Sequence, residues 1–135
     1  EEALQESNLE QLAASLWSVD YSRTHVVFNC QTGRGRSTMG MIVATLMHLW
    51  ACKKGQMTTD VGVESNRVSS YTIVQELVRV LPNGKARMSQ LDYVIDLCSE
   101  TVNVRDIIHI LLAKAESARD PLRASSLRSR ALAYL

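Results

Sequence analysis

A cysteine and an arginine six positions apart frame the segment of this chain that can do chemistry. Cys30 follows the apolar stretch Val26–Phe28, and Arg36 stands at the start of a long run that favours a helix. A thiolate is a nucleophile, and an arginine can donate two parallel hydrogen bonds to two phosphoryl oxygens. The pair therefore indicates a site that binds a phosphate group and carries its own nucleophile.

The residues between the pair suit the same chemistry. Gly33 and Gly35 allow unusual backbone angles and a close approach of a ligand. A strand, loop and helix in that order place free backbone N–H groups and a helix N-terminus at one point, which favours an anion and lowers the pKa of a cysteine there. The predicted phosphate-binding residues are Gln31, Thr32, Gly33, Arg34, Gly35 and Arg36. The predicted catalytic residues are Cys30, Arg36 and Ser37, whose hydroxyl would donate to the departing sulfur.

The pattern C-x-x-G-x-G-R-S over residues 30–37 resembles the signature of the cysteine-dependent phosphatases. Within that superfamily, the run F-N-C-Q-T-G-R-G-R-S-T-M-G-M is most similar to the phytase-like phosphatase domains, and residues 90–98 and 102–106 resemble their helical region behind the loop. The resemblance covers roughly residues 25–112. It implies hydrolysis of phosphate monoesters through a phosphocysteine, with no metal or other cofactor.

Two positions depart from the superfamily pattern. Most members have histidine directly before the cysteine, where Asn29 stands here, and this weakens the case for a lowered cysteine pKa. Their general acid is an aspartate on a loop well upstream, whereas Asp20 lies only ten residues before Cys30. We therefore expect the general acid outside this chain. The alternative function is a pseudophosphatase scaffold that binds phosphorylated ligands or proteins without turnover.

The residue types of the loop bear on two other interpretations and on the substrate. A free cysteine without this context is most often a small buried hydrophobic residue. A nucleotide-binding loop would end in glycine, lysine and serine or threonine, and the lysine is missing here. Arg34 either adds positive potential, which favours phosphoinositides or inositol polyphosphates over phosphotyrosine, or pairs with a neighbouring carboxylate.

Hydrophobic periodicity predicts an α/β fold with one strand and about six helices. The strand, residues 24–29, leads into the loop, and because a parallel strand needs neighbours we expect the rest of the sheet outside this chain. The chain is thus predicted to be the C-terminal part of a cysteine-phosphatase fold. Helices are predicted at residues 2–18, 37–53 (buried and central), 67–81, 88–102, from an Asn103 cap through 112, and from Pro121 to the end. Residues 55–66 are predicted to be a loop, either a connection or a lid.

Residues 1–115 are predicted to belong to the phosphatase-like domain, and residues 116–135 to a helix leading into a following domain. The partners expected are therefore the remainder of a larger multidomain chain and a phosphorylated small molecule or inositol lipid. The last segment carries four arginines, which predict either contact with a membrane surface or a solvated helix face. They are Arg119, Arg123, Arg128 and Arg130.

The overall charge and the remaining cysteines limit the expected partners and the expected cellular setting. Fifteen basic and 14 acidic residues give a net charge of +1, so nucleic acid is not an expected partner. Three cysteines predict no disulfide framework and suit a reducing, cytoplasmic setting. Cys52 and Cys98 are predicted to be inert core residues. The three histidines, His25, His48 and His109, lack metal-ligand spacing and are predicted to be structural.

Overall fold

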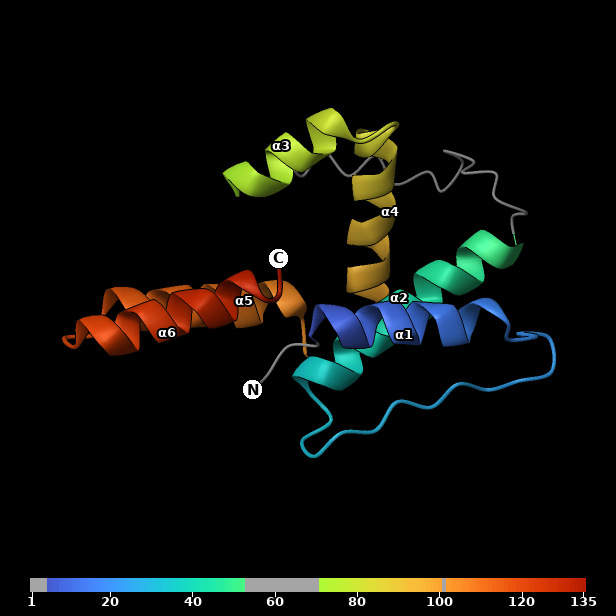
Figure 1. The fold of residues 1–135 in the computed structure, drawn as a ribbon, viewed down its shortest axis with the longest axis horizontal. Coiled ribbons are helices and arrows are strands. Elements are labelled where there is room, and N and C mark those ends of the chain that lie inside the picture. The colour runs from blue at the N-terminus through green and yellow to red at the C-terminus, as the bar shows by residue number, and fades with distance from the viewer. Residues whose placement is uncertain (1–4, 53–70, 101) are drawn as a thin grey trace.

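The computed structural model describes residues 5–52, 71–100 and 102–135, and this part of the chain is helical (Figure 1). Six helices occur in the described ranges. They are α1 (Glu6–Trp17), α2 (Gly35–Cys52), α3 (Thr72–Val80), α4 (Gly84–Leu97), α5 (Val104–Glu116) and α6 (Pro121–Leu132). The predicted helices are therefore present, with ends shifted by a few residues. The predicted loop at 55–66 and the first residues of the predicted helix at 67–81 lie outside the described residues.

The start of α5 confirms the predicted Asn103 cap, and α6 begins at Pro121 as predicted. The Asn103 side chain accepts a hydrogen bond from the backbone N–H of Arg105 at 2.9 Å. Asp120 does the same for Leu122 at 3.1 Å, and Pro121 occupies the first turn of α6, where its missing N–H costs nothing. These caps fix where both helices begin.

The predicted strand over residues 24–29 is not formed in the described part of the chain. Residues 24–30 have no regular secondary structure and run back past α1 to the start of α2 (Figure 1). Val27, in the middle of this segment, is 85% exposed. A strand needs a hydrogen-bonded neighbour, and none of the described segments pairs with this one. The helical part of the predicted fold is confirmed, whereas the α/β sheet is not seen.

The hydrophobic core lies where α2, α4, α5 and α6 meet. Val94 of α4 is completely buried at its centre, and Cys98 is buried beside it, as predicted. The other core residues are Ile42, Val104, Ile107, Ile108, Leu111 and Ala131 from the helices, and Tyr134 just after α6. This core holds the C-terminal helices behind the first half of α2.

Two burial predictions were wrong. The helix α2 was expected to be buried on all sides, but Met41 and Trp50 are 40% and 41% exposed. Its described neighbours are α1, α4 and α5, and they leave Met41 and Trp50 partly uncovered. Cys52 was expected in the core, but it is exposed at the last residue of α2, with its Sγ 3.6 Å from Nδ1 of His48.

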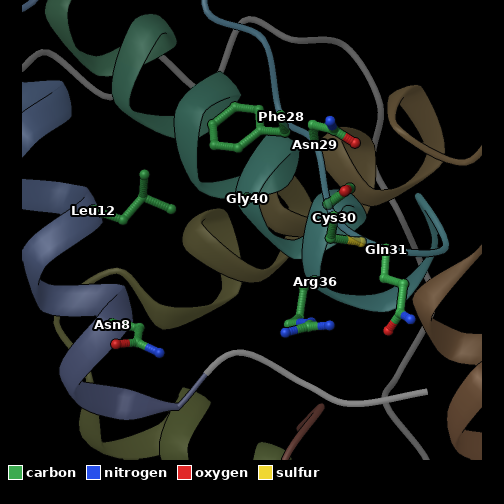
Figure 2. Close-up of a pocket in the computed structure, with 9 residues that line it drawn as sticks. Asn8, Leu12, Phe28, Asn29, Cys30, Gln31, Arg36 and Gly40 are labelled. Atoms are coloured by element: carbon green, nitrogen blue, oxygen red, sulfur yellow. The ribbon is translucent and has the colours of Figure 1, made fainter.

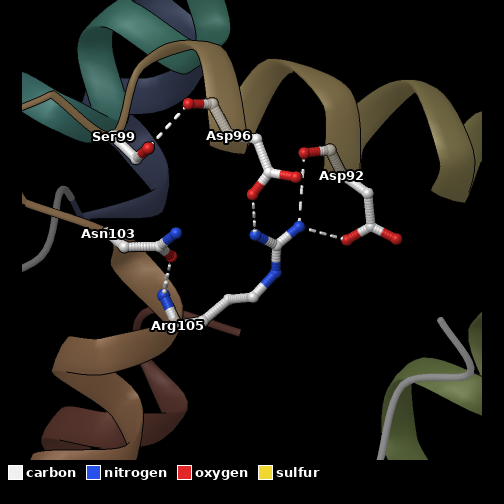
Figure 3. Close-up of polar contacts among 5 residues, drawn as sticks. All are labelled: Asp92, Asp96, Ser99, Asn103 and Arg105. Carbon is white, nitrogen blue, oxygen red and sulfur yellow. Dashed lines mark hydrogen bonds and ion pairs between the residues drawn. The ribbon is translucent and has the colours of Figure 1, made fainter. Parts of the chain in front are cut away.

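Arg105 joins α5 to α4 through two carboxylates (Figure 3). Its guanidinium pairs with Asp92 and lies 2.6 Å from Oδ1 of Asp96. The same group donates to the backbone oxygen of Asp92 at 3.3 Å. Since the Asp92 side chain is only 5% exposed, its pairing with this arginine offsets part of the cost of burying its charge. The ion pair therefore links the first turn of α5 to α4.

Candidate active site

The phosphate loop, residues 30–37, borders a pocket of about 380 Å³ between α2 and α1 (Figure 2). The loop and the segment before it supply Phe28, Asn29, Cys30 and Gln31. The first turns of α2 supply Arg36, Ser37 and Gly40. Asn8 and Leu12 of α1 form the opposite wall. Figure 2 shows Arg36 extending from the start of α2 into the space beside Cys30.

The structure brings part of the predicted site together in this pocket. Cys30, Gln31, Arg36 and Ser37 line it. Thr32, Gly33, Arg34 and Gly35 are not among its lining residues but form the turn behind it. In that turn Gly33 adopts φ 67°, the left-handed conformation that glycine tolerates, and the N–H of Thr38 donates to the backbone oxygen of Arg34 at 2.9 Å.

The pKa of Cys30 is lowered from its ordinary value of 9.0 to about 6. The main cause is the Ser37 hydroxyl, and the backbone N–H groups of Ser37, Thr32 and Gly33 act in the same direction. Partial desolvation opposes them, because it disfavours the charged sulfur. A thiol with this pKa is about nine-tenths thiolate at pH 7, compared with about one part in a hundred for an ordinary cysteine. Cys30 can thus act as a nucleophile near neutral pH.

The Ser37 hydroxyl is buried and makes no well-aligned hydrogen bond within the described residues. It nevertheless faces the sulfur of Cys30 closely enough to lower the pKa of that thiol. The two observations agree if this hydroxyl turns its hydrogen toward the sulfur once the thiol has ionised, because a thiolate accepts hydrogen bonds much more strongly than a thiol.

We expect Ser37→Ala to raise the pKa of Cys30 by at least about one unit, because it removes the largest favourable contact of the thiolate. The thiolate exists above the pKa, so alkylation of Cys30 at pH 7 slows and the midpoint of its pH profile moves upward. Ser15→Ala on the exposed face of α1 is the matched control. An unchanged midpoint in Ser37→Ala would assign the low pKa to the backbone amides alone.

No carboxylate lines the pocket among the described residues. Asp20 follows α1, and its Oδ1 accepts hydrogen bonds from the hydroxyl of Ser22 at 2.6 Å and from the Ser22 N–H at 3.0 Å. These bonds lower the pKa of Asp20. A general acid needs the opposite shift, since it must hold a proton near neutral pH. Asp20 is therefore unsuited to that role.

Five pocket residues were not among the predicted site residues: Asn8, Leu12, Phe28, Asn29 and Gly40. The sequence does contain a signal for Gly40, since a glycine inside an apolar helix often marks a place where another segment packs closely against the helix. Here a β-carbon at position 40 would lie 2.6 Å from the ring of Phe28. The glycine thus lets the segment before Cys30 lie directly against α2. Nothing in the spacing of Asn8 and Leu12 connects α1 to the loop.

We expect Gly40→Ala to push the Phe28 ring away from α2 and to displace Cys30, which lies two residues further along. Misplacing a catalytic group by about 1 Å can cost on the order of a hundredfold in rate. The measurement is the second-order rate of Cys30 alkylation together with the affinity for inorganic phosphate. Combining Gly40→Ala with Phe28→Leu makes room for the methyl group and should restore both values. Failure of this rescue would argue against the contact as the cause.

Sequence comparisons show which family the chain belongs to. Residues 1–48 match the PTP-like phytase family, whose description reads inositol hexakisphosphate. Over 98% of its length the chain is 30% identical to paladin of Gallus gallus, and over 94% it is 31% identical to paladin of Homo sapiens. The chain belongs to the paladin family. The predicted resemblance to phytase-like cysteine phosphatases is therefore confirmed.

This paladin-family chain spans 17% of the length of the Gallus gallus protein and 16% of the human one. Paladin of Xenopus tropicalis is 31% identical over 67% of the chain. No solved structure matches the chain. Within the described residues, none of the helices is both long enough and apolar enough to cross a membrane.

Proposed function

We propose that this chain carries the nucleophile and phosphate loop of a phosphatase domain that hydrolyses phosphate monoesters through a phosphocysteine. The observation that carries the proposal is the lowered pKa of Cys30, about 6, in a pocket that Arg36 also lines. A reactive thiolate beside a bidentate phosphate donor is the combination this chemistry requires.

In the proposed first step, the Cys30 thiolate attacks phosphorus in line with the ester oxygen. A sulfur–phosphorus bond forms, the phosphorus–oxygen ester bond breaks, and the leaving alkoxide takes a proton from the general acid. Arg36 and the loop amides stabilise the negative charge on the three equatorial oxygens. The general acid, now deprotonated, then takes a proton from a water molecule as its oxygen attacks phosphorus. The sulfur–phosphorus bond breaks, the sulfur leaves as thiolate, and inorganic phosphate is released. The hydroxyl of Ser37 stabilises the thiolate in both steps.

The general acid belongs to a segment other than the described pocket lining. We place it on a loop that packs over the pocket in the whole protein, in line with the superfamily's use of an upstream aspartate. The same proposal treats residues 1–115 as part of the phosphatase-like domain and residues 116–135 as a helix that leads toward a following domain. The rest of that multidomain chain would supply the strands that pair with residues 24–29, and a reducing cytoplasmic setting would keep Cys30 active.

The proposed substrates are inositol polyphosphates or phosphoinositides. Arg34, in the turn next to the pocket, adds to the positive potential around Arg36, and this favours ligands with several phosphates. A pocket of about 380 Å³ is within the range of small-molecule sites. The PTP-like phytase match points to the same class of ligand.

Phosphate release by the intact protein tests this proposal. Inositol hexakisphosphate, phosphoinositide vesicles and a phosphotyrosine peptide are compared at equal concentration, and we expect the inositol compounds to have the higher kcat/KM. Arg34→Gln should reduce that preference while leaving hydrolysis of a simple aryl phosphate nearly unchanged. A higher kcat/KM for phosphotyrosine would overturn the substrate assignment.

The second candidate function is a pseudophosphatase that binds phosphorylated ligands or proteins as a scaffold. It is favoured by one observation, the lack of a carboxylate among the described lining residues. Asn29 in place of histidine adds to that case. Tight binding of inositol hexakisphosphate with no phosphate release, under conditions where Cys30 alkylates readily, would identify the scaffold.

A further inference from the structure

A second hollow, of about 490 Å³, lies at the turn between α5 and α6. Figure 1 shows the two helices running side by side, with their connecting turn at the end of the molecule away from α1 and α2. The charged residues lining the hollow are Lys114, Arg119, Asp120 and Arg123, and the others are small or apolar. The proposed phosphatase chemistry does not use this region, and the PTP-like phytase match ends at residue 48.

Local hydrogen bonds fix the backbone of the turn that carries the positive side chains around this hollow. The N–H of Ser117 donates to the backbone oxygen of Ala113 at 3.1 Å and closes α5 just after Lys114. The carboxylate of Asp120 accepts from the N–H of Leu122 at 3.1 Å and opens α6. As a result, Lys114 comes from the end of α5, Arg119 from the turn and Arg123 from the first turns of α6. Three cations, from the end of one helix, the turn and the start of the next helix, thus border the same hollow.

The charge of the hollow is unbalanced. Three cations border it against a single carboxylate, and Asp120 already uses one oxygen to cap α6. Across residues 5–52, 71–100 and 102–135, no ion pair joins Lys114, Arg119 or Arg123 to a carboxylate; the pairs seen belong to Arg105. A concave surface lined by one sign of charge concentrates counter-ions. An anion in the hollow would relieve the repulsion among the cations.

We propose that this hollow is a second binding site, for a phosphate group carried by an inositol phosphate or by an inositol lipid headgroup. Two arginine forks and an ammonium group match the several oxygens and double charge of a phosphate monoester better than a single carboxylate. The volume also admits a ring that bears more than one phosphate. The site does not involve Cys30 and stands whether or not the chain is an active phosphatase.

Leu122 allows the two sources of the phosphate to be separated. It is 82% exposed beside Arg123, so its side chain is available to enter a lipid surface. Cations next to an exposed apolar side chain are typical of contact with anionic membranes. A soluble inositol phosphate would have no use for this leucine.

The soluble arm of the test is calorimetric titration of the intact protein with inositol hexakisphosphate. All variants carry Arg36→Ala, so that the phosphate loop contributes little to binding. We expect Arg119→Gln with Arg123→Gln to weaken binding by at least about tenfold. Arg128→Gln removes the same charge from α6 outside the hollow and should change the affinity by less than about twofold.

A variant that removes a negative charge from the hollow, instead of a positive one, gives a sharper control. Asp120→Asn removes the lining carboxylate but keeps a good cap for α6, because asparagine caps helices as well as aspartate does. We expect it to tighten binding about two- to fivefold while the thermal transition stays in place. A variant that merely unfolded the turn could not produce tighter binding.

The lipid arm measures co-sedimentation with phosphatidylcholine vesicles containing a phosphatidylinositol phosphate. Each removed arginine should weaken vesicle binding about fivefold. If Leu122→Ser weakens vesicle binding but not the soluble titration, the hollow holds a lipid headgroup. If the arginine variants affect only the soluble titration, it holds a free inositol phosphate. The proposal is overturned if neither probe depends on Arg119 and Arg123, or if Arg128→Gln weakens binding as much as they do.

Discussion

Cys30→Ser is expected to lower kcat for phosphate release by at least about a thousandfold while leaving phosphate binding nearly intact. A serine hydroxyl is not ionised near neutral pH, so no phosphoenzyme forms, whereas Arg36 and the loop amides still bind the oxygens. The measurement pairs single-turnover phosphate release from inositol hexakisphosphate with its dissociation constant.

Cys52→Ser is the matched control for this substitution. Cys52 is also a free cysteine. It is exposed at the last residue of α2, at the end of the helix away from Cys30, and does not line the pocket. Its replacement should leave both kcat and affinity within about twofold of the parent. Equal activity of the parent and Cys30→Ser would mean that the phosphatase assignment is wrong.

Arg105→Ala is expected to lower the free energy of unfolding by about 3 kcal/mol. The change leaves the charge of Asp92 buried and without its arginine, at the joint between α4 and α5. A urea titration followed by circular dichroism measures the loss. Because Asp96 is half exposed and can be solvated, most of the cost comes from Asp92.

Two further variants identify the cause of that loss. Arg87→Ala removes an exposed arginine from α4 and should cost less than about 0.5 kcal/mol. Adding Asp92→Asn to Arg105→Ala removes the buried charge that has lost its arginine and should recover part of the stability. If the double variant is less stable than Arg105→Ala, hydrogen bonding by Asp92, not its charge, stabilises the joint.

The arrangement of the predicted phosphate loop could be inferred from the sequence because its parts are local. Cys30, Gly33 and Arg36 lie within one turn and the first residues of a helix, so their spacing alone determines that they meet. The caps Asn103 and Asp120 are local for the same reason, although only the first was predicted. The lowered pKa of Cys30 was expected, but the dominant part that Ser37 has in it required the structure.

Features that depend on distant parts of the chain could not be predicted. The strand at residues 24–29 was inferred from β-branched composition, yet a strand exists only where a neighbour pairs with it. Cys52 lies in an apolar helix, but its exposure depends on which other helices cover that end. The contribution of Asn8 to the pocket depends on how α1 packs against α2, which no local pattern encodes.

The pH profile of Cys30 alkylation, recorded with and without inositol hexakisphosphate, tests the central claim most directly. The measurement uses the intact protein with Cys52→Ser, so that the exposed second thiol does not contribute. The site described here predicts a midpoint near pH 6, matching the lowered pKa of Cys30, and strong protection by the ligand. A midpoint near the ordinary thiol value of 9.0, with no protection by the ligand, would contradict it.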